Sequence, residues 1–177
     1  MEFLGSSIVY ECKRFNVEEA TYKDKDGSIR KRFHVKSPQA VVILPITKDG
    51  KFVFVKQKRT AIGNKMVIEL PAGKVDPGEM PDETAIRELH EETGYVTRDV
   101  EYVLSYYPSN GLSDEKLHFF IATDLEMTEQ DLDEGEDIEV IEMSPDEAYD
   151  MILKGKQENA HTLIALLWYK AFKENNK

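Results

Sequence analysis

The chain has 177 residues, 41% of them hydrophobic, which is enough for one domain with its own core and is typical of a folded globular protein. Its formal charge of −11 argues against nucleic acid or an anionic membrane surface as the main partner. The single cysteine, Cys12, excludes an intrachain disulfide framework and a thiolate metal cluster.

The N-terminal region is predicted to form antiparallel β-strands. Two alternating stretches, residues 6–22 and 28–35, flank the sequence KDKDG, in which Gly27 can supply the positive φ of a hairpin turn. The sequence SPQ at residues 37–39 then favours a boundary, which divides the chain into 1–37 and 38–177. The first ten residues lack the basic and apolar parts of a signal peptide, and no run of about 18 apolar residues follows, so we expect a cytoplasmic protein with no membrane partner.

The next part of the chain alternates strands with one helix. Residues 40–46 and 51–58 are rich in β-branched and aromatic residues and are joined by a hairpin signal at Asp49–Gly50. Residues 65–73 read as one further strand, ended by a proline and a glycine. A helix is predicted to begin at Pro81 and to end before Gly94. Residues 99–109 and 116–125 read as two more strands around a loop.

The C-terminal part is acidic and then helical. From Asp124 to Asp150 there are thirteen acidic residues and no Lys or Arg, which mostly indicates a solvated surface. Ser144 and the proline after it predict the start of a short helix, and residues 159–172 predict a last amphipathic helix. Mixed strands with flanking helices predict an α/β fold, a sheet sandwiched between helices.

The predicted helix in the middle of the chain carries three carboxylates on one face. Glu88, Glu91 and Glu92 are three and four residues apart, and like charges at that spacing destabilise an isolated helix by roughly 0.2–0.5 kcal/mol per pair. One explanation is a solvated acidic face paired with Arg87. The other is a site for a hard cation such as Mg²⁺ or Mn²⁺, which prefers oxygen ligands and would reverse the repulsion.

The stretch from Gly73 to Tyr95 resembles the Nudix box at every defining position: glycine, five residues, Glu79, seven residues, then Arg-Glu-Leu-His-Glu-Glu-Thr-Gly-Tyr. The resemblance implies the Nudix α/β/α fold and hydrolysis of a nucleoside diphosphate linked to another moiety. It also implies two to three Mg²⁺ or Mn²⁺ ions as cofactor.

The resemblance assigns roles position by position. Glu88 and Glu92 should be direct metal ligands, and Glu91 should serve a second ion or a metal-bound water. Glu79 should act indirectly, through water or a salt bridge to Arg87. The resemblance also makes the carbonyl of Ala72 a metal ligand. It makes Gly73 and Arg87 supporting residues.

Residues outside the box resemble the ADP-ribose pyrophosphatase branch of the family, through segments 55–59, 68–79, 106–125 and 133–140. That branch has a proline shortly after the box, here Pro108, and a loop of the form G-x-S-x-E, here Gly111, Ser113 and Glu115. The resemblance makes Glu115 the candidate general base, with Glu92 as its rival. It also implies that Arg59 binds the diphosphate, that Glu69 lies near the substrate, and that Glu139 supports the site from a neighbouring strand.

The branch exchanges its N-terminal strands within a homodimer, and these strands help to hold the adenosine end of the substrate. Arg30 and Arg32 are the candidates for that contact. We therefore expect hydrolysis of ADP-ribose to AMP and ribose 5-phosphate. The alternatives are a GDP-mannose or ADP-glucose pyrophosphatase, a Nudix-fold sensor that binds ADP-ribose without cleaving it, and an 8-oxo-dGTP hydrolase. His34, His118 and His161 have no second histidine at ligand spacing and are expected to be structural, and His90 is expected to be an exposed residue of the helix.

Overall fold

The computed structural model describes residues 1–132, 135 and 137–173. The chain divides into two compact units. The first combines Met1–Gln39 with Tyr106–Leu117, and the second combines Ala40–Ser105 with His118–Lys177. The boundary predicted at residues 37 and 38 stays a prediction, and each unit is described here by itself.

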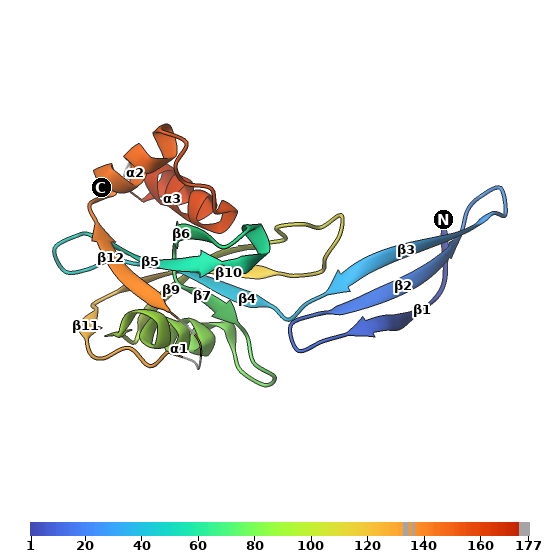
Figure 1. The fold of residues 1–177 in the computed structure, drawn as a ribbon, viewed down its shortest axis with the longest axis horizontal. Coiled ribbons are helices and arrows are strands. Elements are labelled where there is room, and N and C mark those ends of the chain that lie inside the picture. The colour runs from blue at the N-terminus through green and yellow to red at the C-terminus, as the bar shows by residue number, and fades with distance from the viewer. Residues whose placement is uncertain (133–134, 136, 174–177) are drawn as a thin grey trace. The chain divides into compact units, whose positions relative to one another are not determined.

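The first unit contains a three-stranded antiparallel sheet in the order β1–β2–β3 (Figure 1). The strands are β1 (Glu2–Glu11), β2 (Asn16–Lys23) and β3 (Ile29–Lys36). Gly27 has a φ of 87° in the turn between β2 and β3, which confirms the predicted hairpin. Large apolar side chains on these strands are about half exposed: Phe3, Ile8, Tyr10, Ile29 and Phe33.

The loop Tyr106–Leu117 belongs to the first unit because β3 holds it. The amide of Val35 donates to the carbonyl of Leu112 (2.8 Å), and the amide of Asp114 donates to the carbonyl of Val35 (3.2 Å). The carboxylate of Asp114 also accepts from the amide of Ser37 (3.0 Å) and forms an ion pair with Lys36. The loop that contains the predicted general base is therefore fixed to the N-terminal sheet.

The second unit is built on two main sheets, with strand orders β7–β4–β10–β9 and β12–β5–β6. A two-stranded ladder of β8 and β11 accompanies them. The strands are β4 (Ala40–Pro45), β5 (Phe52–Arg59), β6 (Lys65–Glu69), β7 (Ala72–Lys74), β8 (Tyr95–Val96), β9 (Asp99–Tyr106), β10 (Leu117–Thr123), β11 (Glu126–Met127) and β12 (Ile138–Met143). The short 3-10 helix η1 (Thr60–Ile62) follows β5.

Two segments that read as simple local structure in the sequence divide between the sheets. The turn at Asp49–Gly50 forms, with a Gly50 φ of 81°, and an isolated bridge between Ile46 and Phe52 follows at the ends of β4 and β5. They then diverge into different sheets. Residues 65–73, predicted as one strand, form β6 and β7 in different sheets because Pro71 interrupts the run, and its carbonyl accepts from the amide of Ile43 (2.9 Å).

Helices cover the sheets of the second unit on both sides, with α1 (Pro81–Thr93) on one side and α2 (Pro145–Leu153) and α3 (Ala160–Phe172) on the other (Figure 1). All three helices lie where the sequence predicted them, and Ser144 and Asn159 cap α2 and α3 through their side chains. This arrangement confirms the predicted α/β/α fold class. Within the described part of the chain, no helix has the length and hydropathy that a bilayer-spanning segment requires.

The core of the second unit fixes α1. Ala85 and Leu89 are fully buried in a cluster with Val41, Ile43 and Val53, whereas Ile86 is only half-buried. Because these side chains pin one face of α1 to the sheets, the positions of the polar residues on the same helix are determined as well.

Candidate active site

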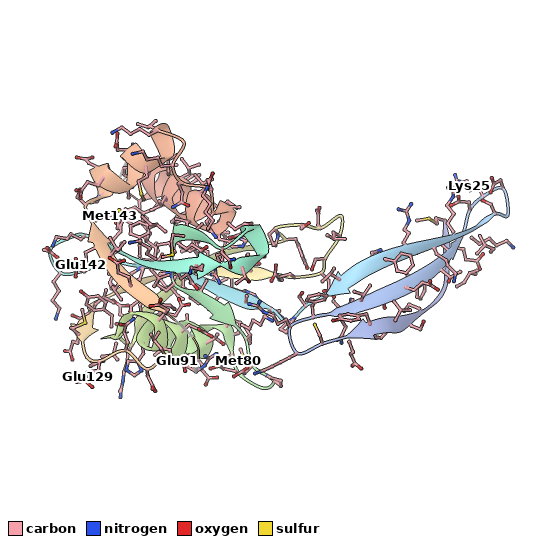
Figure 2. The ribbon with its side chains drawn as sticks, in the orientation of Figure 1. Lys25, Met80, Glu91, Glu129, Glu142 and Met143 are labelled. Carbon is pink, nitrogen blue, oxygen red and sulfur yellow. The ribbon has the colours of Figure 1, made fainter. Side chains whose placement is uncertain are left out.

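The helix α1 begins and ends as its sequence dictates. Pro81 occupies the first helical position, and the carboxylate of Glu83 accepts a hydrogen bond from the amide of Met80 (2.9 Å) at the helix start (Figure 2). Gly94 ends the helix with a φ of 73°, a left-handed conformation that favours glycine. Between these ends, the helix carries Glu88, Glu91 and Glu92, the three carboxylates that the sequence predicts as metal ligands.

Two carboxylates one helical turn apart converge on two adjacent residues of β7. The carboxylate of Glu92, whose residue is only 6% exposed, accepts a hydrogen bond from the amide of Ala72 (3.0 Å). The carboxylate of Glu88 lies against Gly73, where a Cβ would stand 1.8 Å from the Glu88 Cδ. A side chain at position 73 would therefore displace the Glu88 carboxylate from this place.

Arg87 links the carboxylate of Glu88 to those of Glu79 and Glu91. Its guanidinium donates to both oxygens of Glu79 (3.0 and 2.9 Å), to Glu88 (2.8 Å) and to Glu91 (2.8 Å). It also donates to the carbonyl of Lys74 (3.1 Å). Three carboxylates thus share one guanidinium, and an excess of negative charge stays at this face of α1.

The carboxylate of Glu79 is saturated with donors. Besides Arg87, it accepts from the hydroxyl of Thr84 (2.7 Å) and from the amide of Asp76 (3.3 Å). The hydrogen bonds from Arg87, more than any other contact, lower the pKa of Glu79 to about 2. The same contact with Glu79 is the main reason that the pKa of Arg87 is raised. The Glu79 carboxylate thereby fixes both the loop before α1 and the guanidinium of Arg87. These contacts favour an indirect role of Glu79 in metal binding.

The donor set fits a hard divalent cation. Glu88, Glu91, Glu92 and the Ala72 carbonyl offer only oxygen, the donor that Mg²⁺ and Mn²⁺ prefer. The Glu88 carboxylate can lie against Gly73 because glycine has no Cβ. No three His, Cys, Asp or Glu side chains among residues 1–132, 135 and 137–173 stand as a group that could hold a metal ion. In this arrangement Arg87 engages Glu88 and Glu91, and the Ala72 amide engages Glu92.

A second polar pair lies at the ends of β5 and β6. The Nε of Arg59 donates to both carboxylate oxygens of Glu69 (3.1 Å each), and Glu69 is only 4% exposed. The backbone on either side of Glu69 is fixed from the α3 end of the chain. There, Gln157 donates to the carbonyl of Ile68 (3.1 Å), and the hydroxyl of Thr162 accepts from the amide of Leu70 (2.9 Å).

His161, which the sequence predicts to be structural, lies close to this pair. Burial lowers its pKa, with Glu69 raising it and Arg59 lowering it further. No local motif marks His161, because the long sequence separation between α3 and β6 hides the contact. The hydrogen bond through its neighbour Thr162 places it there.

The other predicted site residues, apart from Glu139, lie in the first unit. Pro108, Gly111 and Glu115 are in the loop that β3 holds, and burial together with Glu115 raises the pKa of Tyr106. Arg30 and Arg32 are two residues apart on β3, so they lie on the same face of the strand. Arg30 forms an ion pair with Asp24. The structure therefore groups these residues in one unit and the carboxylates of α1 in the other.

Glu139 is exposed on β12, where its carboxylate accepts from Lys56 of the adjacent strand (2.7 Å). Within the acidic stretch that precedes it, Asp133, Glu134 and Glu136 lie outside the described residues. Sequence reasoning missed Thr84 and Gln130, which contact Glu79 and the carbonyl of Glu92. For Thr84 a signal existed, since it sits one helical turn before Glu88; for Gln130 none did.

Comparison with known proteins gives a consistent result. The NUDIX domain family matches residues 36–166. An ADP-ribose pyrophosphatase of Bacillus subtilis is 38% identical over 143 residues, covering 80% of this chain and 77% of that protein. A methanol dehydrogenase activator of Bacillus methanolicus is 39% identical over 143 residues, with the same two coverages, 80% and 77%. A crystal structure of an ADP compounds hydrolase has the same fold, with a TM-score of 0.85, 22% identity, and coverage of 98% of this chain and 94% of that one.

Proposed function

The chain belongs to the NUDIX domain family, and on that basis we propose that it is a metal-dependent pyrophosphatase that hydrolyses ADP-ribose to AMP and ribose 5-phosphate. Membership confirms the resemblance of the stretch Gly73–Tyr95 to the Nudix box. The substrate follows from the relatives named ADP-ribose pyrophosphatase, such as the Bacillus subtilis protein.

The observation that carries the proposal is the convergence of Glu88 and Glu92 on Ala72 and Gly73. Two carboxylates and a backbone segment meet there with only oxygen atoms available as metal ligands. Nudix ADP-ribose pyrophosphatases generally use divalent metal ions. Glu88, Glu92 and the Ala72 carbonyl would hold one ion, and Glu91 would serve a second, with Mg²⁺ or Mn²⁺ as the metal and two to three ions in all.

The residues of the chain would divide the remaining work. A bound divalent cation supplies charge neutralisation at the diphosphate and lowers the pKa of water. Arg87 keeps Glu88 and Glu91 from repelling each other, and Glu79 holds Arg87. Arg59 presents a forked donor suited to phosphate oxygens, with Glu69 orienting it. Water would attack phosphorus in line, as is typical of diphosphate hydrolysis.

We assign the general base to Glu115, with Glu92 as the rival. The hydrogen bond from the Ala72 amide and the low exposure of Glu92 favour a fixed ligand over a base that must reach water. Glu115 lies in a loop, where catalytic residues often occur. A carboxylate at neutral pH is ionised and can accept the proton from water. Glu139 would support the site from β12.

The N-terminal sheet fits a role in a homodimer. Five large apolar side chains on its strands are about half exposed, and exposed apolar side chains of this kind are typical of interaction surfaces: Phe3, Ile8, Tyr10, Ile29 and Phe33. In the proposed dimer, these strands and Arg30 and Arg32 would contact the adenosine end of the substrate, near Pro108 and Gly111. A cytoplasmic location, with no nucleic acid or membrane as partner, stays a prediction.

A nucleotide-sugar substrate such as GDP-mannose or ADP-glucose is the main alternative, because nothing in the described residues selects the terminal ribose. A sensor that binds ADP-ribose without hydrolysis is disfavoured, since every box glutamate is present. Glu79, Glu88 and Glu91 are held by Arg87, and Glu92 is held by the Ala72 amide.

The proposal is tested by incubating the protein with Mg²⁺ and, separately, ADP-ribose, ADP-glucose, GDP-mannose and dNTPs. We expect ADP-ribose to be consumed fastest, with AMP and ribose 5-phosphate as the products on chromatography. Consumption of dNTPs alone, with release of pyrophosphate, would overturn the proposal. Faster turnover of GDP-mannose would select the alternative. Repeating the reaction in ¹⁸O-labelled water identifies the phosphorus that water attacks.

A further inference from the structure

The end of α1 is held by a short segment that follows β11. β11 pairs with β8 in register Glu126↔Val96 and Met127↔Tyr95, directly after the helix. The chain then turns across the helix end. Figure 2 shows Glu91 on α1 and Glu129 of this segment at the same edge of the second unit. We name Thr128, Gln130 and Asp131 the helix-end clamp.

The helix-end clamp supplies donors to backbone carbonyls that have no partner within the helix. The bonds are Asp131 N–H to Glu91 O (3.2 Å), Gln130 Nε2 to Glu92 O (2.6 Å), and both Thr128 N–H and Thr128 Oγ1 to Gly94 O (2.7 Å each). Two of the three carbonyls belong to residues whose carboxylates we assign to metal binding. The clamp therefore holds the backbone from which these carboxylates project.

Gly94 makes this close approach possible. Besides its positive φ, a Cβ at position 94 would lie 2.8 Å from the carbonyl oxygen of Thr128 and 3.1 Å from the amide nitrogen of Gln130. Glycine is thus needed both to end the helix and to admit the clamp.

The last turn of α1 needs such support. Its carbonyls form the negative end of the helix dipole, and the carboxylates of Glu91 and Glu92 add like charge in the same turn. Helix ends also fray more readily than helix centres. A turn that must present two carboxylates to a cation in one geometry is therefore the part of α1 that most needs external hydrogen bonds.

We propose that the helix-end clamp is a positioning element that fixes the last turn of α1 so that Glu91 and Glu92 are preorganised for metal binding. The inference rests on the proposed function only in assigning metal to these two carboxylates. Partners that orient metal ligands without touching the metal commonly change metal affinity by about 10–100-fold when they are removed.

The test uses Gln130→Met, which keeps the length of the side chain and removes its donor. Glu129→Gln, a change at the neighbouring exposed position, is the matched control. The full-length metal-free protein is examined by amide hydrogen exchange, and Mn²⁺ binding is then titrated by electron paramagnetic resonance. We expect the amides of Thr93 and Gly94 to exchange about tenfold faster in Gln130→Met, and the Mn²⁺ dissociation constant to rise about tenfold. The amide of Leu89 and the midpoint of thermal unfolding should not change.

Thr128 provides a second variant and a rescue. Thr128→Val removes the hydroxyl donor and should act in the same direction as Gln130→Met, whereas Thr128→Ser keeps the hydroxyl and should bind Mn²⁺ as the wild type does.

Faster exchange with unchanged Mn²⁺ affinity would reduce the clamp to a structural support and overturn the positioning role, as would unchanged exchange. Neither readout requires ADP-ribose turnover, so a wild type that binds Mn²⁺ but leaves ADP-ribose intact contradicts only the proposed substrate. A wild type that binds no Mn²⁺ contradicts the metal assignment, and the positioning role with it.

Discussion

At the scale of single residues, Gly73 is the position where a side chain would displace a predicted metal ligand. A Cβ at this position would stand 1.8–2.2 Å from three atoms of the Glu88 carboxyl group, so any substitution must displace that group. A misplacement of about 1 Å at a catalytic group can cost about 100-fold in rate.

We therefore expect Gly73→Ala to reduce ADP-ribose turnover at least about tenfold and to raise the Mg²⁺ concentration needed for half-maximal rate. Steady-state kinetics at several Mg²⁺ concentrations measure both effects, and circular dichroism checks that the variant is folded. A folded Gly73→Ala variant with wild-type Mg²⁺ dependence would contradict the placement of Glu88.

The lowered pKa of Glu79 predicts how the stability of the fold depends on pH. Its pKa in the folded protein is about 2, below the ordinary value of 4.5, mainly because of Arg87. A carboxyl group with a lowered pKa stabilises the fold above its unfolded pKa, and that contribution is lost as the pH falls toward the folded pKa.

The difference in the free energy of unfolding between wild type and Glu79→Gln should therefore be constant above about pH 5 and shrink from there toward pH 2. Urea denaturation of the metal-free proteins at a series of pH values measures it. Asp82→Asn, at an exposed position of α1, serves as the control. Glu147→Gln would not serve, because the Glu147 carboxylate caps α2. A difference that stays constant down to pH 2 would contradict the lowered pKa of Glu79 in the folded protein.

At the scale of elements, α3 contributes a buried hydrogen bond as well as an apolar face to the second unit. Its buried Thr162 accepts a hydrogen bond from the amide of Leu70, next to the Arg59–Glu69 pair. Thr162→Val should leave that amide without its partner and lower the free energy of unfolding by about 2 kcal/mol. Thr162→Ser should keep most of the stability. Urea unfolding measures both, and equal stability of the Val variant and the wild type would contradict the role of this bond.

The elements also show how far sequence reasoning reaches. The three helices, their caps and the N-terminal hairpin were predictable because their signals are local: Pro81, Gly94, Ser144 and Gly27 act within a few residues. The separation of β6 from β7 and the divergence of β4 from β5 were not, since they depend on which sheet each strand joins. The two-residue ladder of β8 and β11 is too short to leave a periodic pattern.

The same distinction holds for the site. The spacing of Glu88 and Glu92 predicted a shared face, but their meeting with Ala72 and Gly73 depends on the packing of α1 against β7. Gln130 and His161 reach the site from segments distant in sequence, and neither belongs to a motif. The candidate metal ligands and the supporting residues inside the box were therefore visible in the sequence, whereas the contacts from Gln130 and His161 were not.

At the scale of the whole molecule, the homodimer is the main expectation. One chain has a mass of 20.3 kDa, and light scattering after size-exclusion chromatography should give twice that value. Phe33→Asp, at an exposed position of β3, should shift the protein toward the monomer without unfolding it and weaken ADP-ribose binding. A fully active wild-type monomer would contradict both the dimer and its role at the adenosine end.

We propose that the α1 carboxylates that converge on Ala72 and Gly73 form the hydrolytic centre of the molecule. The most direct measurement is the rate of AMP release from ADP-ribose by Glu92→Gln at saturating Mg²⁺, with Asp82→Asn on the same helix as control. We predict that Glu92→Gln loses at least about 100-fold in turnover, because a ligand matters at least as much as its supporting partners, while Asp82→Asn retains the wild-type rate. Wild-type turnover by a folded Glu92→Gln variant would contradict the assignment of this site.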